Sequence, residues 1–226
     1  MLLNPYRFAP GASGGITVTY HNRQFQTTVS TTRGVDISGA STGDLMIVMF
    51  AIRATVGGVI ASRAGRTSLL NTAQSDNVRV RIFYRIKESG DASTQTFTGD
   101  VSANIDTEYF IQSGTFDAAT PPEAVGTANA FSASPNPASL SPSWGSHETL
   151  WIAGYGARAY TDAAPSVYPY DDTMYSSSHG SGGSNSSAAS LATCSEIVDA
   201  SSADPSAFTL SASRAWASFT VAVKGA

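Results

Sequence analysis

The sequence predicts an all-β protein, an antiparallel β-sandwich or jelly roll with a short extended N-terminal arm. Residues 78–87 alternate between apolar and mainly basic side chains, which is the period of a strand with one face on a core. About ten short segments rich in β-branched residues lie between turns rich in Gly, Pro and Ser, the pattern of sandwiches and jelly rolls. The helical crossovers that a parallel sheet requires are missing from the pattern.

The strands are expected at residues 16–20, 25–29, 44–53, 78–87, 94–98, 105–111, 149–155, 191–198, 208–211 and 216–224. Of these, residues 44–53 form a nearly continuous apolar run after the Gly43–Asp44 turn. Such a run fits a buried strand or a buried helix segment. Its length and its place after a turn favour a strand that lies between two layers.

The chain is interpreted as one β-sandwich domain over residues 14–226, preceded by an extended arm over residues 1–13. Two packed subdomains divided near Pro121 are the alternative. Residues 176–190 (SSSHGSGGSNSSAAS) are expected to be a mobile surface loop, because a run of Ser and Gly cannot supply a core.

The composition excludes several classes of partner. With 13 Lys and Arg against 17 Asp and Glu, and a net charge of -4, no basic surface is expected to bind nucleic acid. The longest apolar run, residues 45–52, is too short to span a membrane, and the N-terminus lacks the pattern of a signal peptide. The lone Cys194 excludes an internal disulfide and a zinc site built on several cysteines. A hydroxyl-rich chain without disulfides fits a protein that folds in a reducing cytoplasm and operates outside it, as virion components do. The equal alternative is an ordinary cytoplasmic β-protein.

No catalytic residue, metal or cofactor is expected. Residues 11–15 match G-x-S-x-G around Ser13, but a nucleophile elbow needs a strand before the serine and a helix after it. A flexible hinge is therefore the interpretation of this segment. The three histidines, His21, His147 and His179, show no ligand spacing that would suggest a metal site or a catalytic triad.

The N-terminal arm is the first candidate interface. Its two prolines, Pro5 and Pro10, disfavour helix and favour an extended segment. We expect this segment to dock on a neighbouring chain, because aromatic and arginine side chains anchor interfaces. The alternative is that the segment covers one end of its own sandwich. The candidate contact residues are Leu2, Leu3, Tyr6, Arg7 and Phe8.

The basic face of residues 78–87 is the second candidate interface, with Arg79, Arg81, Phe83 and Arg85 as its contact residues. Arginine interleaved with an aromatic residue is favoured where proteins meet, since guanidinium groups pair with carboxylates and stack on rings. The equal alternative is a solvated face that keeps the strand from pairing wrongly.

A tyrosine-rich loop beside two carboxylates is the third candidate. Its residues are Tyr168, Tyr170, Asp171, Asp172 and Tyr175. They could form a platform for a sugar or a calcium site, because calcium prefers oxygen ligands. The spacing of an EF-hand-type calcium loop is absent, so a solvated turn or a protein contact is favoured over a ligand site.

Four stretches of the chain, at residues 3–8, 43–48, 78–86 and 214–223, resemble sequences in a loose group of structural proteins of tailed bacteriophages. Members of this group are similar in being all-β, jelly-roll-like, rich in Gly, Ser and Thr, and part of the head surface or the tail. The resemblance carries no catalytic residue to transfer.

The sequence and the resemblance together predict a non-enzymatic virion protein of a tailed double-stranded DNA phage, most specifically a capsid decoration or cement protein. It would assemble in the host cytoplasm, be exposed on the particle surface and bind the major capsid protein or another virion protein, with a homotrimer favoured. One alternative is a tail fibre or tail-tip protein that binds host glycan through the tyrosine loop. Another is a glycan hydrolase or lyase that uses Asp171 or Asp172.

Overall fold

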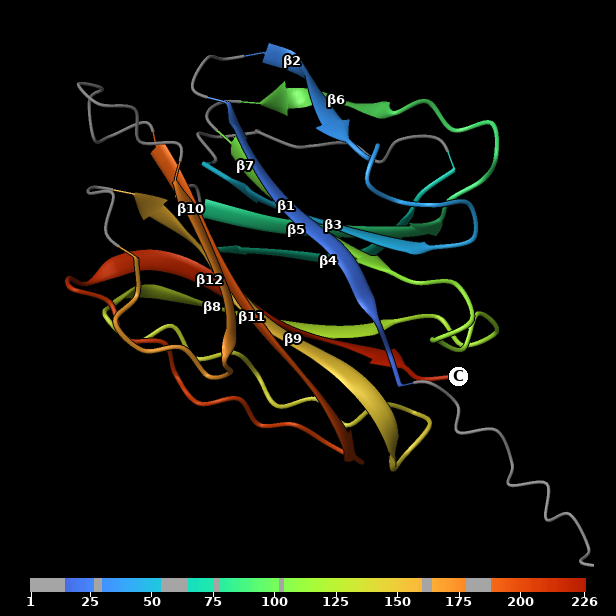
Figure 1. Ribbon diagram of the computed structural model, residues 1–226. Helices are drawn as coiled ribbons and strands as arrows, with labels where there is room; N and C mark the ends of the chain where they lie inside the picture. Colours follow the sequence, from blue (N-terminus) through green and yellow to red (C-terminus); the bar gives the residue numbers. More distant parts are fainter. Residues whose placement is uncertain are drawn as a thin grey trace, which may run out of the picture.

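The computed structural model describes residues 15–26, 30–53, 65–74, 78–101, 104–159, 164–177 and 188–226, and in this part of the chain the regular secondary structure is β-strand (Figure 1). The strands are β1 (Val18–Gln26), β2 (Ser30–Asp36), β3 (Leu45–Ile52), β4 (Thr67–Gln74), β5 (Val78–Ile86), β6 (Thr94–Val101), β7 (Asn104–Ile111), β8 (Glu123–Ser132), β9 (His147–Ala159), β10 (Asp172–Ser177), β11 (Ala188–Ala200) and β12 (Arg214–Lys224). None of the described residues belongs to a helix with the length and hydropathy of a membrane span.

Two five-stranded antiparallel sheets make up the sandwich. The first has the order β1-β7-β3-β5-β4, and the second has the order β10-β11-β9-β12-β8. Strands β2 and β6 form a separate antiparallel pair that covers the outer side of the first sheet (Figure 1). The predicted all-β class and the antiparallel sandwich are confirmed. Each large sheet comes from one half of the chain, and the core between the sheets draws side chains from both halves.

Strand β3 is buried on both faces, as its unbroken apolar sequence predicts. Leu45, Ile47 and Met49 point into the main core between the two large sheets. Met46, Val48 and the other even-numbered residues point the opposite way, into a second core under β2 and β6. Because side chains alternate along a strand, an apolar residue at every position requires a layer on each side, and the β2–β6 pair supplies the outer one.

A third apolar cluster covers the outer face of the second sheet. Tyr155 and Trp216 from that sheet pack with Phe208 and Leu210 of the loop before β12. Residues 208–211 were expected to be a strand, but within them only Thr209 forms an isolated bridge, to Val167. Their apolar side chains cover the sheet from a loop instead of extending the sheet by a strand.

Several strand predictions need correction. The segments expected at 16–20 and 25–29 overlap a single strand, β1. Strands β2, β4, β8 and β10 were not predicted. The loop expected at 176–190 is shorter, because its first two residues belong to β10 and its last three to β11. Ala189, inside the expected loop, is fully buried in the main core. The rest of that loop and the arm at 1–13 lie outside the described residues.

The two sides of the sandwich differ. On one side the edge strands β4 and β8 meet, and a Cβ added at Gly126 would lie 2.9 Å from a Thr72 methyl carbon. On the other side the edge strands are β1 and β10. There the sheets leave a groove between the beginning of β1 and the strands β10 and β11, which is the open side of the sandwich.

Candidate functional site

The groove on the open side has a volume of about 390 Å³. Its lining combines aliphatic side chains with two carboxylates and two hydroxyls, from Ile16, Thr17, Val18, Leu150, Asp172, Ser195, Glu196 and Ile197. A concave site with an apolar lining and a few polar groups is the usual form of a binding site in proteins. This groove is therefore the candidate site.

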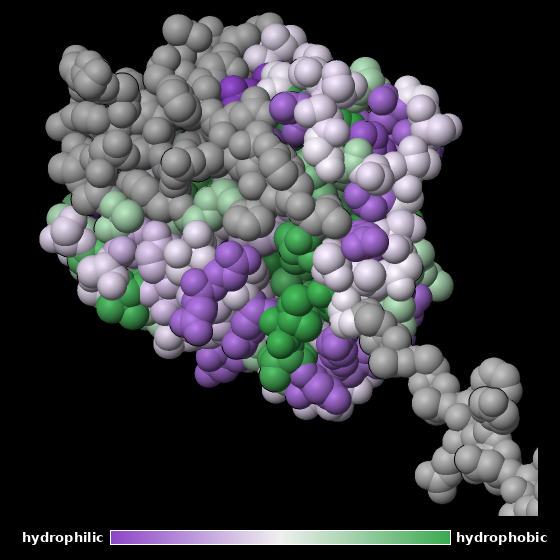
Figure 2. Space-filling model, in the orientation of Figure 1, coloured by the Kyte–Doolittle hydropathy of each residue, from purple (hydrophilic) through white to green (hydrophobic). Residues whose placement is uncertain are grey.

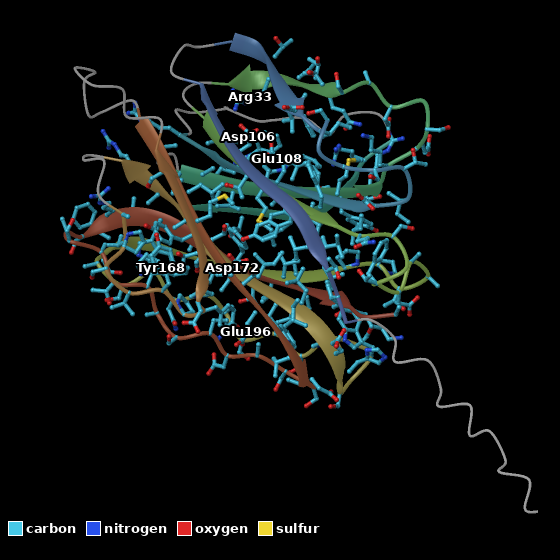
Figure 3. The ribbon with its side chains drawn as sticks, viewed as in Figure 1. Arg33, Asp106, Glu108, Tyr168, Asp172 and Glu196 are labelled. Carbon is cyan, nitrogen blue, oxygen red and sulfur yellow. The ribbon has the colours of Figure 1, made fainter. Side chains whose placement is uncertain are left out.

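The carboxylates of the groove are placed by the pairing of β10 with β11. In this register Asp172 lies opposite Ser195, and the Ser195 hydroxyl donates a hydrogen bond to Asp172 Oδ2 at 2.9 Å. Glu196 follows Ser195 on β11 and is exposed; Figure 3 shows Asp172 and Glu196. Partial burial, and then the charge of Asp171, raise the pKa of Glu196 above its usual value. Because side chains alternate along a strand, Glu196 points to the opposite face from Ser195, toward Tyr170 and Asp171, and Asp172 is the carboxylate that lies with Ser195 at the groove.

One aliphatic side chain of β11, Ile197, lines the groove and is 45% exposed. The next residue, Val198, is 42% exposed but points to the opposite face of the strand. Figure 2 shows an apolar strip, in green, between hydrophilic side chains on this face, over the beginning of β1 and the lower half of β11. An exposed apolar strip with a polar border is typical of a contact surface.

The two residues just before β1 are held by hydrogen bonds at the rim of this groove. The backbone N–H of Ile16 donates to Glu148 Oε1 at 2.8 Å, and the N–H of Thr17 donates to the hydroxyl of Thr115 at 3.1 Å. The backbone carbonyl of Glu148 also accepts a hydrogen bond from the N–H of Gly225 at 2.8 Å. Ile16 and Thr17 are thus fixed beside the groove and close to the C-terminus.

Of the predicted tyrosine loop, the structure brings only Asp172 to the groove. The Tyr168 ring packs edge-on against Phe208, with 5.6 Å between the ring centroids. Tyr170 is half-buried against the same third core, and burial raises the pKa of its hydroxyl. Asp171 is exposed, and the side chain of Tyr175 lies outside the described residues. Two of the three tyrosines therefore pack on the protein itself.

The basic face of β5 is covered in its middle, which corrects the prediction of an exposed face there. Phe83 is fully buried in the second core and lies 5.5 Å from the ring of Phe97 on β6. Phe83 therefore cannot anchor an interface with another chain. The physical reason is the β2–β6 pair, because this pair covers the outer face of the first sheet.

Two arginines of β5, Arg81 and Arg85, make contacts within the chain. Arg85 forms ion pairs with Glu88 and Asp91, each at 3.1 Å. The Arg81 guanidinium lies 5.2 Å from the centre of the Phe83 ring. Burial, and then the charge of Arg79, lower the pKa of Arg81. The predicted interface residues of the arm, Leu2 to Phe8, lie outside the described residues.

A buried cluster of charged residues under the β2–β6 pair was not predicted from the sequence. Arg33 of β2 donates from Nε to Asp106 Oδ1 of β7 at 2.7 Å, and Glu108 lies beside Asp106 on the same strand (Figure 3). Burial, and then the charge of Asp106, raise the pKa of Glu108 to about 10. The protonated form of Glu108 is therefore favoured at neutral pH. The alternation of charged residues at 106 and 108 was the available signal, since it places both on one face of a strand.

This charged cluster is enclosed, and so is a second polar contact near it. Asp106 and Glu108 are both 0% exposed, so a molecule in solution does not reach them in this conformation. Nearby, the Nε of Arg66 donates to Gln95 Oε1 of β6 at 2.8 Å, and its guanidinium lies 5.3 Å from the centre of the Phe97 ring. Both contacts join the small sheet to the body of the sandwich.

Within the described residues, no three or more His, Cys, Asp or Glu side chains are grouped so that they could hold a metal ion. Of the residues considered at the sequence level, Ser13 and His179 and the side chain of His21 lie outside the described part. In the comparisons with known proteins, no family model matches the chain, and no curated protein and no solved structure matches it.

Proposed function

We propose that this chain is a non-enzymatic structural protein of the virion of a tailed double-stranded DNA phage, acting as a capsid decoration or cement protein on the head surface. The four sequence stretches that resemble phage structural proteins support this proposal. A neutral, hydroxyl-rich composition supports it as well, because such a surface suits a protein that works outside the cell.

The observation that carries the proposal is the open side of the sandwich. Its groove is lined mainly by aliphatic side chains, with the carboxylate of Asp172 among them, and Ile197 of this lining is 45% exposed. Apolar area with charged groups at the rim is the composition of a protein contact. Glu108, whose pKa burial raises to about 10, lies instead in the enclosed interior, where it contributes to structure.

A cement protein works by repetition of one contact. A specific interface of roughly 1,600 Å² is enough for stable docking of one copy on a capsomer. Point-group symmetry of the head then repeats this contact. Trimer formation would link three such contacts. The overall affinity for the capsid would then rise although each single contact stays the same. Three stacked apolar layers supply the rigid support that such a contact requires.

The copy number in purified particles tests the proposal. Quantitative staining of a gel should give this chain in amounts comparable to the major capsid protein, because a decoration protein occupies sites over the whole head. A few copies per particle would instead place it in the tail, where the groove and the nearby tyrosine loop would serve host binding. Absence from washed particles would contradict both locations.

A second measurement addresses the enzymatic alternative. The purified protein, with Asp171→Ala and Asp172→Ala as controls, should release no reducing ends from host-surface glycans. Turnover that either substitution abolishes would replace the proposal with a glycan hydrolase or lyase.

A further inference from the structure

We propose that the β2–β6 pair is a lid, which opens from the first large sheet as one unit while the rest of the sandwich stays folded, and that the charge of the buried cluster beneath it controls the opening. The lid covers the outer face of the first sheet, whereas the groove opens between the two large sheets. The inference therefore does not depend on the proposed role in a virion. Its basis is the attachment of the pair and the composition of the contact that the pair covers.

The pair is attached to the body by its side chains and, at one end, by hydrogen bonds. Its two strands hydrogen-bond to each other and form a sheet of their own, which lies over the first large sheet (Figure 1). Where the chain leaves β2, the Lys87 ammonium donates to the carbonyl oxygens of Ile37 and Ala40. Lys87 is itself held on the body, because its carbonyl accepts a hydrogen bond from the N–H of Gly43 at 2.9 Å. This end of the pair can therefore act as the hinge.

The contact beneath the lid is partly apolar and partly charged. Val35 and Phe97 of the lid belong to the second core. Arg33 of the lid donates from Nε to Asp106 Oδ1 at 2.7 Å. Glu108 lies two residues further along β7, on the same face of the strand, and Figure 3 shows the three charged residues close together. Two carboxyl groups thus share one guanidinium group, and with both ionised this enclosed cluster carries a net negative charge.

The carboxyl groups of the cluster are poorly satisfied while the lid is closed. Both Asp106 and Glu108 are fully buried. Among the described residues, neither carboxyl oxygen of Glu108 has a hydrogen-bond partner, and Asp106 Oδ2 has none either. A buried polar group without a partner is costly, and a buried charge is more costly still. Opening gives these oxygens access to water, so the cluster favours the open lid when Glu108 is ionised.

The charges around Glu108 set the direction of the effect. Burial, and then the charge of Asp106, raise the pKa of Glu108 to about 10. The charge of Arg33 opposes this rise, and the charge of Asp36 on the lid adds to it. The closed lid therefore holds Glu108 in its protonated form.

The neighbouring strands bring no charge to the positions paired with Glu108. These positions are Val48 of β3 and Asn22 of β1, and neither residue titrates. Two further guanidinium groups near the contact lie over aromatic rings, that of Arg66 over Phe97 and that of Arg81 over Phe83. The cluster of Arg33, Asp106 and Glu108 is therefore the part of the contact that responds to pH.

Opening of the lid should follow the ionisation of Glu108. In the open state the carboxyl group is hydrated and titrates near the ordinary glutamate value of 4.5, well below its value under the closed lid. Between these two values the open state has lost a proton that the closed state keeps. A rise in pH therefore shifts the equilibrium toward the open lid, by up to about tenfold per pH unit for one such group.

Hydrogen exchange of the full chain between pH 5 and 8, followed by mass spectrometry, tests the lid. Each rate is divided by the intrinsic exchange rate at the same pH, so that the ratio reports opening alone. A two-stranded pair is at best marginally stable by itself, so its hydrogen bonds break when the lid opens. We expect the opening seen at β2 and β6 to be at least tenfold more populated than the one seen at β9 and β12. It should also become more populated by about tenfold per pH unit.

Two variants separate the charge of the cluster from its packing. Glu108→Gln cannot ionise, so the opening of its lid should not change with pH. Glu88→Gln removes a carboxyl group whose side chain is 78% exposed, and this control should keep the wild-type pH dependence. Wild-type amides of β2 and β6 that exchange only together with those of β9 and β12 would overturn the proposal, and this comparison requires no variant. A pH dependence that persists in Glu108→Gln would overturn it as well. Neither result alters the copy number expected in particles.

Discussion

Arg33 on β2 and Asp106 on β7 form an ion pair that is sealed between the small sheet and the first large sheet. The side chains are 8% and 0% exposed, and the Arg33 Nε lies 2.7 Å from Asp106 Oδ1. The small sheet covers the second core through Val35 and Phe97. The ion pair therefore adds a charged contact to an apolar one and fixes how the small sheet lies on the sandwich.

Removing the negative charge of this pair should destabilise the protein strongly. In Asp106→Asn the Arg33 guanidinium stays buried without its counter-charge, and breaking one partner of a buried ion pair costs about 3–5 kcal/mol. Urea denaturation followed by tryptophan fluorescence would measure the change in the free energy of unfolding.

The matched control is the more exposed ion pair of Lys224 with Asp117, whose atoms lie 2.8 Å apart. Asp117→Asn should have a much smaller effect, because solvent screens this pair. The double variant Arg33→Met, Asp106→Leu should lose less stability than the two single substitutions added together. An Asp106→Asn variant as stable as wild type would contradict the structural role of the pair.

Glu108 should make the protein less stable as the pH rises. Burial, and then the charge of Asp106, raise the pKa of Glu108 in the folded state to about 10, from 4.5 for an ordinary glutamate. Between these two values the folded state holds a proton that the unfolded state has lost, so the free energy of unfolding falls with increasing pH. The slope from one such group is at most about 1.4 kcal/mol per pH unit.

The substitution Glu108→Gln removes this titration and keeps a side chain of nearly the same size and shape. The variant should therefore gain stability over wild type as the pH rises from 5 to 9, measured by urea denaturation at each pH. A stability difference that is constant over this range would show that Glu108 has the same pKa in both states.

The strands that were predicted from the sequence are those whose pattern reports burial directly. In β3 every residue is apolar, and in β5 Val78, Val80 and Ile82 alternate with more polar residues. The strands that were missed lack such a pattern. Strand β2 (STTRGVD) is mostly polar and contributes Val35 to a core whose existence depends on its pairing with β6. Phe83 was predicted to be exposed for the same reason. The sequence of a strand does not show which other segment covers its second face.

The candidate site was only partly predictable for a similar reason. Asp172 stood out because of its neighbours in the sequence. Ser195, Glu196 and Ile197 did not, since the pairing of β10 with β11 brings them to Asp172. This register is set by tertiary packing, as the fully buried Leu191 and Ala192 of β11 show. Residues from separate strands thus formed a groove that local sequence patterns do not describe.

Gly156 should be required for the close approach of the two large sheets. It lies on β9, and a Cβ added there would be 2.8 Å from the Cβ of Ala51 and 2.8 Å from a methyl carbon of Val80. Because these neighbours belong to the opposite sheet, Gly156→Ala should overpack the core and cost about 1–3 kcal/mol. Thermal unfolding would show a lower Tm. Gly90→Ala is the control, because a Cβ at Gly90 has no neighbour within 4 Å, and its Tm should stay near that of wild type.

Cys194 should report unfolding rather than act as a reactive thiol. It is fully buried in the third core, its Sγ lies 3.7 Å from the carbonyl oxygen of Ala153, and burial raises its pKa to about 12. The thiolate is the reactive form of cysteine, and the folded protein offers neither thiolate nor access. An Ellman reagent at pH 8 should therefore label Cys194 only as fast as the protein opens, and completely in urea. Labelling of Cys194 in Gly156→Ala should be faster by the factor that the loss of stability of this variant predicts. The less stable variant spends a larger fraction of time in the open state, in which the thiol reacts. Rapid labelling of the native wild type would contradict the packing of β11 against its covering loop.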